Sequence, residues 1–237
     1  MLQESRGAGG THTRIHRSVL AAQEKRLLVW IAHRLPRWIN SDHLSAVGLG
    51  AMCAAGLSIA LLPSNGWAAA GFIVSIAANW FGDSLDGTLA RVRRHERPRY
   101  GYYVDHVIDI GGTTALMAGL ACSGLMSPLL AALVLCAFLL VSAESYLSTH
   151  AAGVFRISFM GFGPTELRIL LAIGVLKAAV SPVVDAPIVG PARLFDIGGA
   201  VALVGLAVVF VVSALRTTRA LYRAEPLPQQ EQTPRAA

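Results

Sequence analysis

The sequence has little charge, few aromatic side chains and only three cysteines. Charged residues make up 14% of its 237 positions, aromatic residues 7% and hydrophobic residues 54%. A soluble domain carries roughly a quarter of its residues as charged side chains, so this composition excludes an ordinary soluble globular protein. The cysteines lie in apolar stretches without the spacing of metal ligands, and we interpret them as small packing residues: Cys53, Cys122 and Cys136.

Long apolar runs take the place of the missing charge. A helix needs about 20 apolar residues to cross a bilayer. Six runs are that long, or nearly so: 44–62, 67–90, 102–123, 128–149, 165–182 and 196–218. We therefore expect an all-α integral membrane protein in which residues 41–222 form one domain of six transmembrane helices.

The two ends of the chain differ from this apolar body. Residues 1–40 form a polar, basic arm, and from 18 to 39 apolar and basic residues recur at helical spacing. That pattern predicts an amphipathic helix that lies in the lipid headgroup layer, although a helix packed on a soluble partner has the same pattern. Residues 223–237 are rich in Pro, Gln and Glu, which predicts a disordered tail.

Lys and Arg residues gather on one side of the expected spans. Seven of the 20 precede the first run and five lie between the second and third, whereas the short loops 63–66 and 124–128 have none. The positive-inside rule then places both termini and the aspartates between residues 83 and 109 on the cytoplasmic side of the membrane. We expect this membrane to be an inner membrane of the bacterial type. We interpret the net charge of +6 as this topological signal, with anionic lipids rather than nucleic acid as partners.

Aspartates and small residues form one pattern at the polar ends of the second and third runs. The pattern is D-x2-D-G-x2-A-R-x9-G-x3-D-x3-D, formed by Asp83, Asp86, Gly87, Ala90, Arg91, Gly101, Asp105 and Asp109. Each pair of aspartates shares one helix face, and the short loop between the helices lets the two pairs converge. Carboxylate oxygens suit hard cations, and four carboxylates in an apolar pocket need cations between them. The pattern therefore predicts a site for two Mg²⁺ or Mn²⁺ ions.

This pattern resembles the signature of the CDP-alcohol phosphotransferase family, membrane enzymes that make phospholipid headgroup linkages and release CMP. The nine residues between Arg91 and Gly101 exceed the family's usual gap of about seven or eight, and the extra residue falls in a polar loop that tolerates insertion. The resemblance implies a CDP-linked donor and an alcohol acceptor. CDP-diacylglycerol is the expected donor and a CDP-amino-alcohol the variant within the family.

The resemblance also implies roles for the residues of the pattern. Asp83, Asp86 and Asp105 would bind metal, and Asp109 would deprotonate the acceptor alcohol and touch the second metal. The remaining four would bind the nucleotide: Gly87, Ala90, Arg91 and Gly101. Packing of neighbouring helices is the alternative interpretation of the small residues, and a topological charge is the alternative for Arg91.

A second polar group lies between the fourth and fifth runs, on the same expected side as the aspartates. It contains Arg156, the stretch 161–166 that ends in Glu166, and Arg168. A similar G-P-T-E stretch occurs in the amino-alcohol branch of the family. Glu166 could recognise a headgroup cation and the two arginines an anionic phosphate. The structural alternative is a helix start flanked by topological arginines.

Two other kinds of protein fit parts of the sequence. A cation transporter would place carboxylates inside the membrane along an ion path. A scaffold that has lost activity would keep the fold, but all four aspartates are present here. The sequence leaves open which alcohol is the acceptor and whether the protein forms a homodimer.

Overall fold

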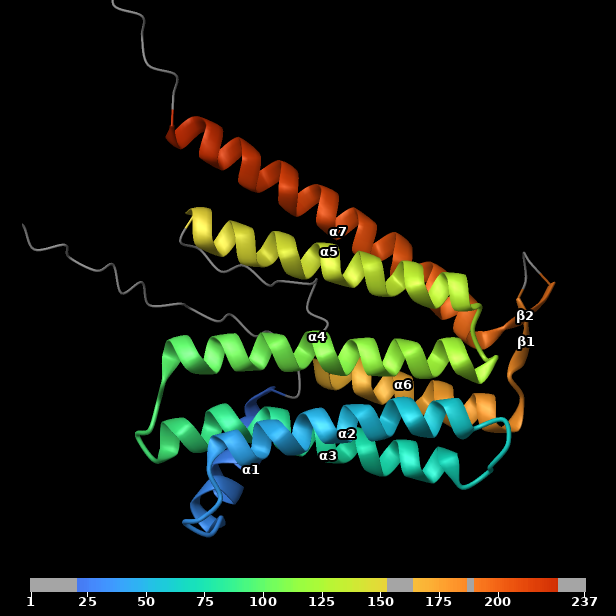
Figure 1. Ribbon diagram of the computed structural model, residues 1–237, viewed down its shortest axis with the longest axis horizontal. Helices are drawn as coiled ribbons and strands as arrows, with labels where there is room; N and C mark the ends of the chain where they lie inside the picture. The colour runs from blue at the N-terminus through green and yellow to red at the C-terminus, as the bar shows by residue number, and fades with distance from the viewer. Residues whose placement is uncertain (1–20, 153–163, 187–189, 226–237) are drawn as a thin grey trace, which may run out of the picture.

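The computed structural model describes residues 21–152, 164–186 and 190–225 (Figure 1). These residues form seven helices and one β-hairpin: α1 (Ala21–Arg34), α2 (Ser41–Leu61), α3 (Ala68–Val92), α4 (Pro98–Ser123), α5 (Pro128–Ala152), α6 (Pro164–Val180), β1 (Val183–Ala186), β2 (Gly190–Arg193) and α7 (Leu194–Ala224). Helices α2 to α7 each lie over one of the six apolar runs. The prediction of a helical fold is therefore confirmed.

Three of the helices are long and apolar enough to cross a membrane: Ser41–Leu61, Pro128–Ala151 and Leu194–Ala224. They belong to α2, α5 and α7. Helix α6 has 17 residues, fewer than the roughly 20 that a span requires, and the described parts of α3 and α4 carry the aspartates. That these three helices also cross the membrane stays a prediction.

The β-hairpin was not expected from the sequence. Strands β1 and β2 pair antiparallel, with Val183 opposite Arg193 and Ala186 opposite Gly190. A two-stranded hairpin is marginal in isolation, and this one is continuous with α7, which begins directly after β2. Figure 1 shows the hairpin at the same end as the α2–α3 and α4–α5 turns, whereas the α3–α4 loop lies at the opposite end.

Helix α2 is the centre of the packing, because it contacts both α3 and α4 closely. A Cβ atom on Gly82 of α3 would lie 2.5 Å from the carbonyl oxygen of Leu44 and 2.7 Å from the amide nitrogen of Gly48. On the other side of α2, a Cβ on Gly119 of α4 would clash with the carbonyl of Gly56. These crossings need glycine because backbone lies directly against backbone.

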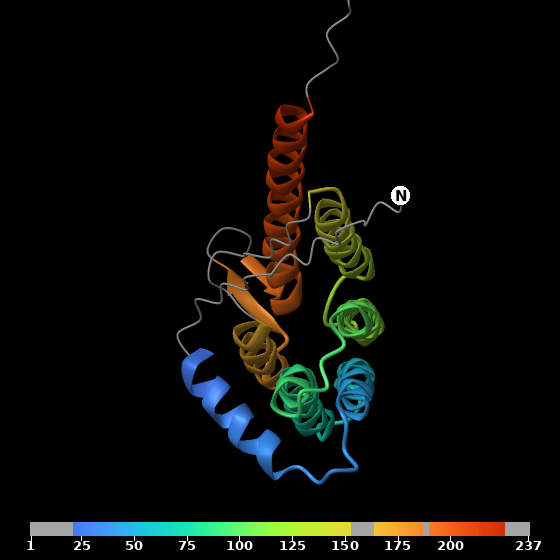
Figure 2. The ribbon, with the colours of Figure 1, turned by 90° about the vertical axis from the view of Figure 1, so that its left-hand side faces the viewer.

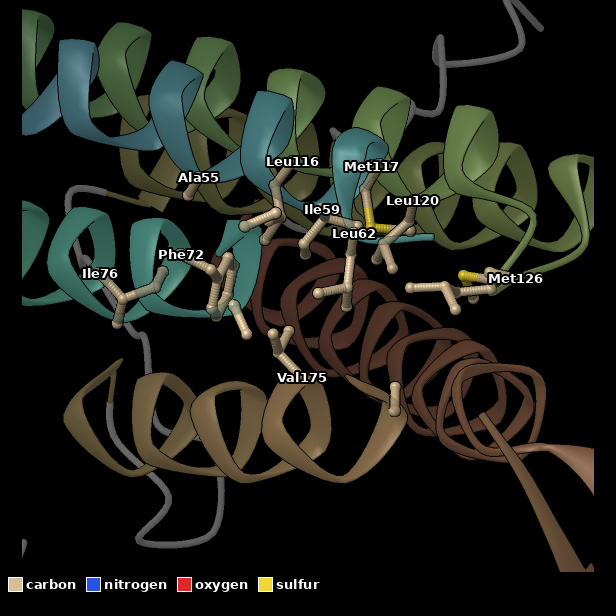
Figure 3. Packing of buried hydrophobic residues seen from close by; sticks show 14 of the residues in the cluster. Ala55, Ile59, Leu62, Phe72, Ile76, Leu116, Met117, Leu120, Met126 and Val175 are labelled. Carbon is tan, nitrogen blue, oxygen red and sulfur yellow. The ribbon is translucent and has the colours of Figure 1, made fainter. Parts of the chain in front are cut away.

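Buried apolar side chains fill the space between α2, α3, α4 and α6 (Figure 3). Figure 3 shows side chains from all four helices pointing toward one another, among them Ile59, Phe72, Leu116 and Val175. The three cysteines do not belong to this core, since Cys53, Cys122 and Cys136 are exposed on helix surfaces. Their interpretation as packing residues inside the chain is therefore wrong: an apolar run does not say which residues face outward.

Helix α1 lies across α3 at the end that carries the aspartates (Figure 2). Its buried residues Leu28 and Ala32 form a second apolar cluster with Leu44, Leu85 and Leu89. The indole nitrogen of Trp80 in α3 donates a hydrogen bond of 2.7 Å to Glu24 of α1. One face of α1 is thus covered by the protein itself, and its position in a headgroup layer stays a prediction.

Helix α7 packs against α5 and extends away from the other helices (Figure 2). The hydroxyl groups of Ser213 and Thr217 donate to the two carboxylate oxygens of Glu144 at 2.6 and 3.2 Å. Large apolar side chains on the rest of α7 are exposed, among them Val201, Val204 and Val208. This surface suits contact with lipid.

Candidate functional site

The four aspartates lie on two consecutive helices, α3 and α4, which both pack on α2, at one end of the bundle. Asp83 and Asp86 are in the last turns of α3, and Asp105 and Asp109 are in the first half of α4. Asp83 and Asp105 are close enough to Asp86 to interact with it electrostatically. The structure thus brings these three together, while Asp109 lies one helical turn further along α4 and is exposed.

The start of α2 holds Asp86 in place. The Ser45 hydroxyl donates to one oxygen of the Asp86 carboxylate at 2.6 Å, and the amide of Gly87 donates to the other at 2.5 Å. The Ser41 hydroxyl donates to the backbone carbonyl of Asp86 at 2.9 Å. Asn40 begins this helix by accepting a hydrogen bond from the amide of His43. Sequence reasoning missed Ser45, because its partner is 41 positions away.

Asp83 pairs with Arg168, which the sequence analysis assigned to a possible acceptor site. A terminal nitrogen of Arg168 in α6 lies 2.5 Å from a carboxylate oxygen of Asp83, and the Arg168 Nε donates to the Asn79 side-chain oxygen at 2.9 Å. The Asn79 amide nitrogen in turn donates to the carbonyl of Gly48 at 3.0 Å. Asn79 is buried, and it connects α2, α3 and α6. The sequence feature that could have pointed to Asn79 is its polar amide, which lies one helical turn before Asp83 in an otherwise apolar run.

The expected nucleotide residues lie at the same end. A Cβ on Gly87 would lie 3.4 Å from the guanidinium of Arg91, so this side chain folds back over the glycine, and it donates to Thr88 at 3.2 Å. Among the described residues, no atom lies within 4 Å of the position of a Cβ on Gly101. Ala90 borders a cavity of about 420 Å³ that is otherwise lined by Asn40, Ser41, Asp42, Leu89, Arg93, His95, Glu96 and Arg97.

Two arginines of this cavity are fixed by partners. Arg93 donates to the backbone carbonyls of Leu35 and Pro36, at 2.9 and 3.0 Å, and also to that of Ile39. Arg97 donates to both carboxylate oxygens of Asp42, at 2.5 and 2.7 Å. They join the α3–α4 loop to the segment before α2 and to the first turn of α2. Arg93 and Arg97 thus shape the cavity wall as well as adding positive charge.

Helix α5 contributes an aromatic side chain beside the α4 aspartates. The His106 ring stacks on Tyr102 with centroids 4.2 Å apart and meets the ring of Tyr146 edge-on at 5.0 Å. Tyr146 lies within electrostatic range of Asp109 and Asp105. His106 Nδ1 is 4.0 Å from a carboxylate oxygen of Asp105. These rings join α4 to α5 next to the residue expected to act as the base.

The expected acceptor group is only partly described. Arg156 lies outside the described residues, Glu166 is half-buried in the first turn of α6, and Arg168 faces Asp83. Thr165 donates to Glu24 of α1 at 3.2 Å. The same carboxylate thus binds α3 and α6, which fixes the start of the helix that carries Arg168.

The donor atoms fit a hard divalent cation, since the aspartate carboxylates supply oxygen ligands. Within the described ranges, no three His, Cys, Asp or Glu side chains are arranged as a metal site. One carboxylate is already occupied by a cation of the protein itself, because the guanidinium of Arg168 lies on Asp83. The chemistry of these side chains fits a divalent metal ion.

The helices and the site define a class: a membrane protein with a cluster of carboxylates at one end of a helical bundle. The sequence model of the CDP-alcohol phosphatidyltransferase family matches residues 43–213, more than half of the chain, and the protein belongs to this family. Its members are transferases that use CDP-alcohol donors and alcohol acceptors, in general with a divalent metal. A comparison with curated proteins found no match.

Proposed function

We propose that the protein transfers the phosphatidyl group of CDP-diacylglycerol to an alcohol hydroxyl and releases CMP, with Mg²⁺ or Mn²⁺ as cofactor. The family match over residues 43–213 is the observation that carries this proposal. The electrostatic contact of Asp86 with Asp83 and Asp105 supports the position of the site. A cation transporter has no comparable support.

The aspartates have two roles in the proposed reaction, metal binding and general-base catalysis. Asp83, Asp86 and Asp105 would hold the divalent ions, and Asp109 would also contact the second ion. A bound metal would neutralise the charge that develops on the phosphoryl oxygens. Asp109 takes the proton of the acceptor hydroxyl as general base. It suits this role because it is exposed on α4, where an incoming alcohol can reach it.

The bonds change in a single displacement at phosphorus. The acceptor oxygen forms a bond to the phosphorus that carries diacylglycerol, and the bond from this phosphorus to the bridging oxygen breaks. The electron pair of that bond leaves with CMP, and the acceptor proton goes to Asp109. Members of the amino-alcohol branch would present a phospho-alcohol group instead, with a lipid hydroxyl as acceptor.

The nucleotide lies along the face of α3 that continues from the aspartates. Gly87, Ala90 and Gly101 leave space for it, and Arg91 binds the diphosphate through its guanidinium. The cavity beside Ala90, lined by Arg93 and Arg97, supports this location. Arg91 folds over Gly87 in the structure, so it has to swing outward when the nucleotide binds.

The acceptor or its headgroup is recognised by Arg156, Glu166 and Arg168. A carboxylate and two guanidinium groups could bind an acceptor that carries both charges, or an anionic phosphate. Glu166 and Arg168 lie in the first turns of α6, which Thr165 attaches to α1 through Glu24.

One assay tests the reaction and its cofactor. The purified protein in detergent is incubated with CDP-diacylglycerol or CDP-choline and a panel of alcohols, and CMP and lipid product are measured. We expect CMP release with one donor class and complete loss of it in EDTA, restored by Mg²⁺ or Mn²⁺. Full turnover in a metal-free preparation would contradict the proposed role of the carboxylates.

The proposed topology has six spans in residues 41–222, both termini in the cytoplasm and the aspartates on the cytoplasmic side. Residues 1–40 and 223–237 flank this catalytic domain. In a variant without its three cysteines, Asn65→Cys should react with an impermeant thiol reagent from outside the cell and Glu96→Cys only after permeabilisation. The opposite labelling pattern would invert the orientation and move the site to the other side.

A further inference from the structure

Arg168 is bound to the carboxylate that the proposed function gives to a metal ion. We infer that Arg168 is a built-in counter-cation of Asp83, that Asn79 positions it, and that it competes with the divalent ion for this carboxylate. The inference rests on the proposed metal site. It predicts that replacing Arg168 by a neutral residue strengthens metal binding, whereas replacing a residue of a binding site usually weakens it.

The contact between Arg168 and Asp83 is short and partly shielded from water. The two charged atoms are 2.5 Å apart, and the side chains of Arg168 and Asp83 are 15% and 28% exposed. The partners come from α6 and α3, which are 85 positions apart in the sequence. An ion pair of this kind is stronger than one on an open surface, where water and salt weaken the attraction.

Asn79 determines the direction in which Arg168 points. Its side-chain oxygen accepts from the Nε of Arg168, and its amide group is anchored to the carbonyl of Gly48 in α2. The guanidinium is planar, so a fixed Nε also fixes the direction of its terminal nitrogens. Asn79 lies one helical turn before Asp83, and this spacing sets the two acceptors side by side for the two donors.

The electrostatics of the site explain why a resident cation is needed. Asp83 and Asp105 both interact with Asp86, and neighbouring carboxylates repel one another in a half-buried site. Arg168 offsets part of this repulsion in the protein alone. An arginine stays protonated at every accessible pH, so Arg168 can release Asp83 only by moving. The apparent metal affinity is then the intrinsic affinity multiplied by the fraction of protein in which Arg168 has moved.

Binding of Mn²⁺, followed by the electron paramagnetic resonance signal of the free ion, tests this competition without a reaction. The full chain in detergent is titrated as wild type, Arg168→Gln, Asp83→Asn and Arg219→Gln, the last a matched loss of charge at an exposed position on α7. If Asp83 is released about one tenth of the time, Arg168→Gln should bind Mn²⁺ about tenfold more tightly than wild type. Arg219→Gln should match wild type, and Asp83→Asn should bind more weakly.

A second variant keeps the inference testable if Arg168→Gln does not fold. Arg168→Lys keeps the charge, but a lysine ammonium group lacks the planar guanidinium that bonds Asn79 and Asp83 through two separate nitrogens. It should bind Mn²⁺ with an affinity between those of wild type and Arg168→Gln. Equal or weaker binding in both Arg168 variants, with wild-type binding that depends on Asp83, would overturn the inference alone. Absence of binding in every variant and in wild type would overturn the metal site as well.

Discussion

In the unit formed by α2, α3 and α4, backbones touch at glycine pairs, whereas in the pair formed by α5 and α7 large apolar side chains point outward. About a third of the residues in the most apolar stretch of α2 are buried inside the protein. In α7 the corresponding share is 6%. The first arrangement keeps helices in one register, because no side chain separates them. The second provides a surface for lipid. The candidate site lies in the unit whose geometry is the more tightly fixed.

The carboxylates in the two regions differ in the same way. Asp83 and Asp86 lie near other carboxylates and are held by Arg168 and Ser45. Glu144, between α5 and α7, accepts hydrogen bonds from two hydroxyl groups. A carboxylate whose oxygens accept from hydroxyl groups links two helices, whereas several carboxylates close together form a negatively charged site that can bind a cation or take part in catalysis. Both kinds of carboxylate lie in apolar helices, so only their hydrogen-bond and charge partners distinguish a structural carboxylate from a functional one.

The largest effect should come from the aspartates of the α2–α3–α4 unit. Asp109→Asn should lower kcat by roughly 100-fold or more, the scale of lost general-base catalysis, while binding of CDP with Mg²⁺ survives far better than in Asp86→Asn. Asp86→Asn should lose both activity and CDP binding, because the proposal gives Asp86 no role other than metal ligand. Thermal-shift titration with CDP and Mg²⁺ separates the two. Near-normal turnover in Asp109→Asn would move the base elsewhere, with Glu166 the next candidate.

A smaller effect should follow from added volume at the helix crossing. Gly82→Ala brings a methyl group to 2.5 Å from the carbonyl of Leu44, and overpacking of this kind costs about 1–3 kcal/mol. We expect a melting temperature several degrees lower in detergent, and reduced activity because Asp83 adjoins the crossing. The matched control is Gly205→Ala on α7, where no described atom lies within 4 Å, and its stability should not fall. Equal melting temperatures of the two variants would show that α2 and α3 can separate at little cost.

The smallest effect should come from the carboxylate of the α5–α7 pair. Glu144→Gln keeps only one of the two oxygens that accept from Ser213 and Thr217, so the loss of one hydrogen bond should lower the free energy of unfolding by about 1 kcal/mol. CMP release should stay within about twofold of wild type, in contrast to Asp86→Asn. A loss of activity comparable with that of Asp86→Asn would place Glu144 in the site and remove the distinction drawn between the two regions.

Much of the fold was readable from the sequence because it depends on local pattern. The six apolar runs became six helices. The short loop between Val92 and Pro98 brings the aspartate ends of α3 and α4 to the same end of the bundle, but both helices pack on α2 rather than on each other. The hairpin was missed because its strands have four residues each, too few for an alternating pattern. The outward orientation of the cysteines was missed because a uniformly apolar helix does not mark its buried face.

The sequence by itself determined where the helices form and which side chains share a helix face, since both depend on residues three or four positions apart. The aspartate pattern and the family match can likewise be read from the sequence alone. Only the tertiary structure decided that Ser45 holds Asp86, that Arg168 lies on Asp83 and that Gly82 meets α2. Partners 41 and 85 positions apart are selected by the packing of whole helices, and that packing depends on the summed contacts of both surfaces rather than on any local repeat.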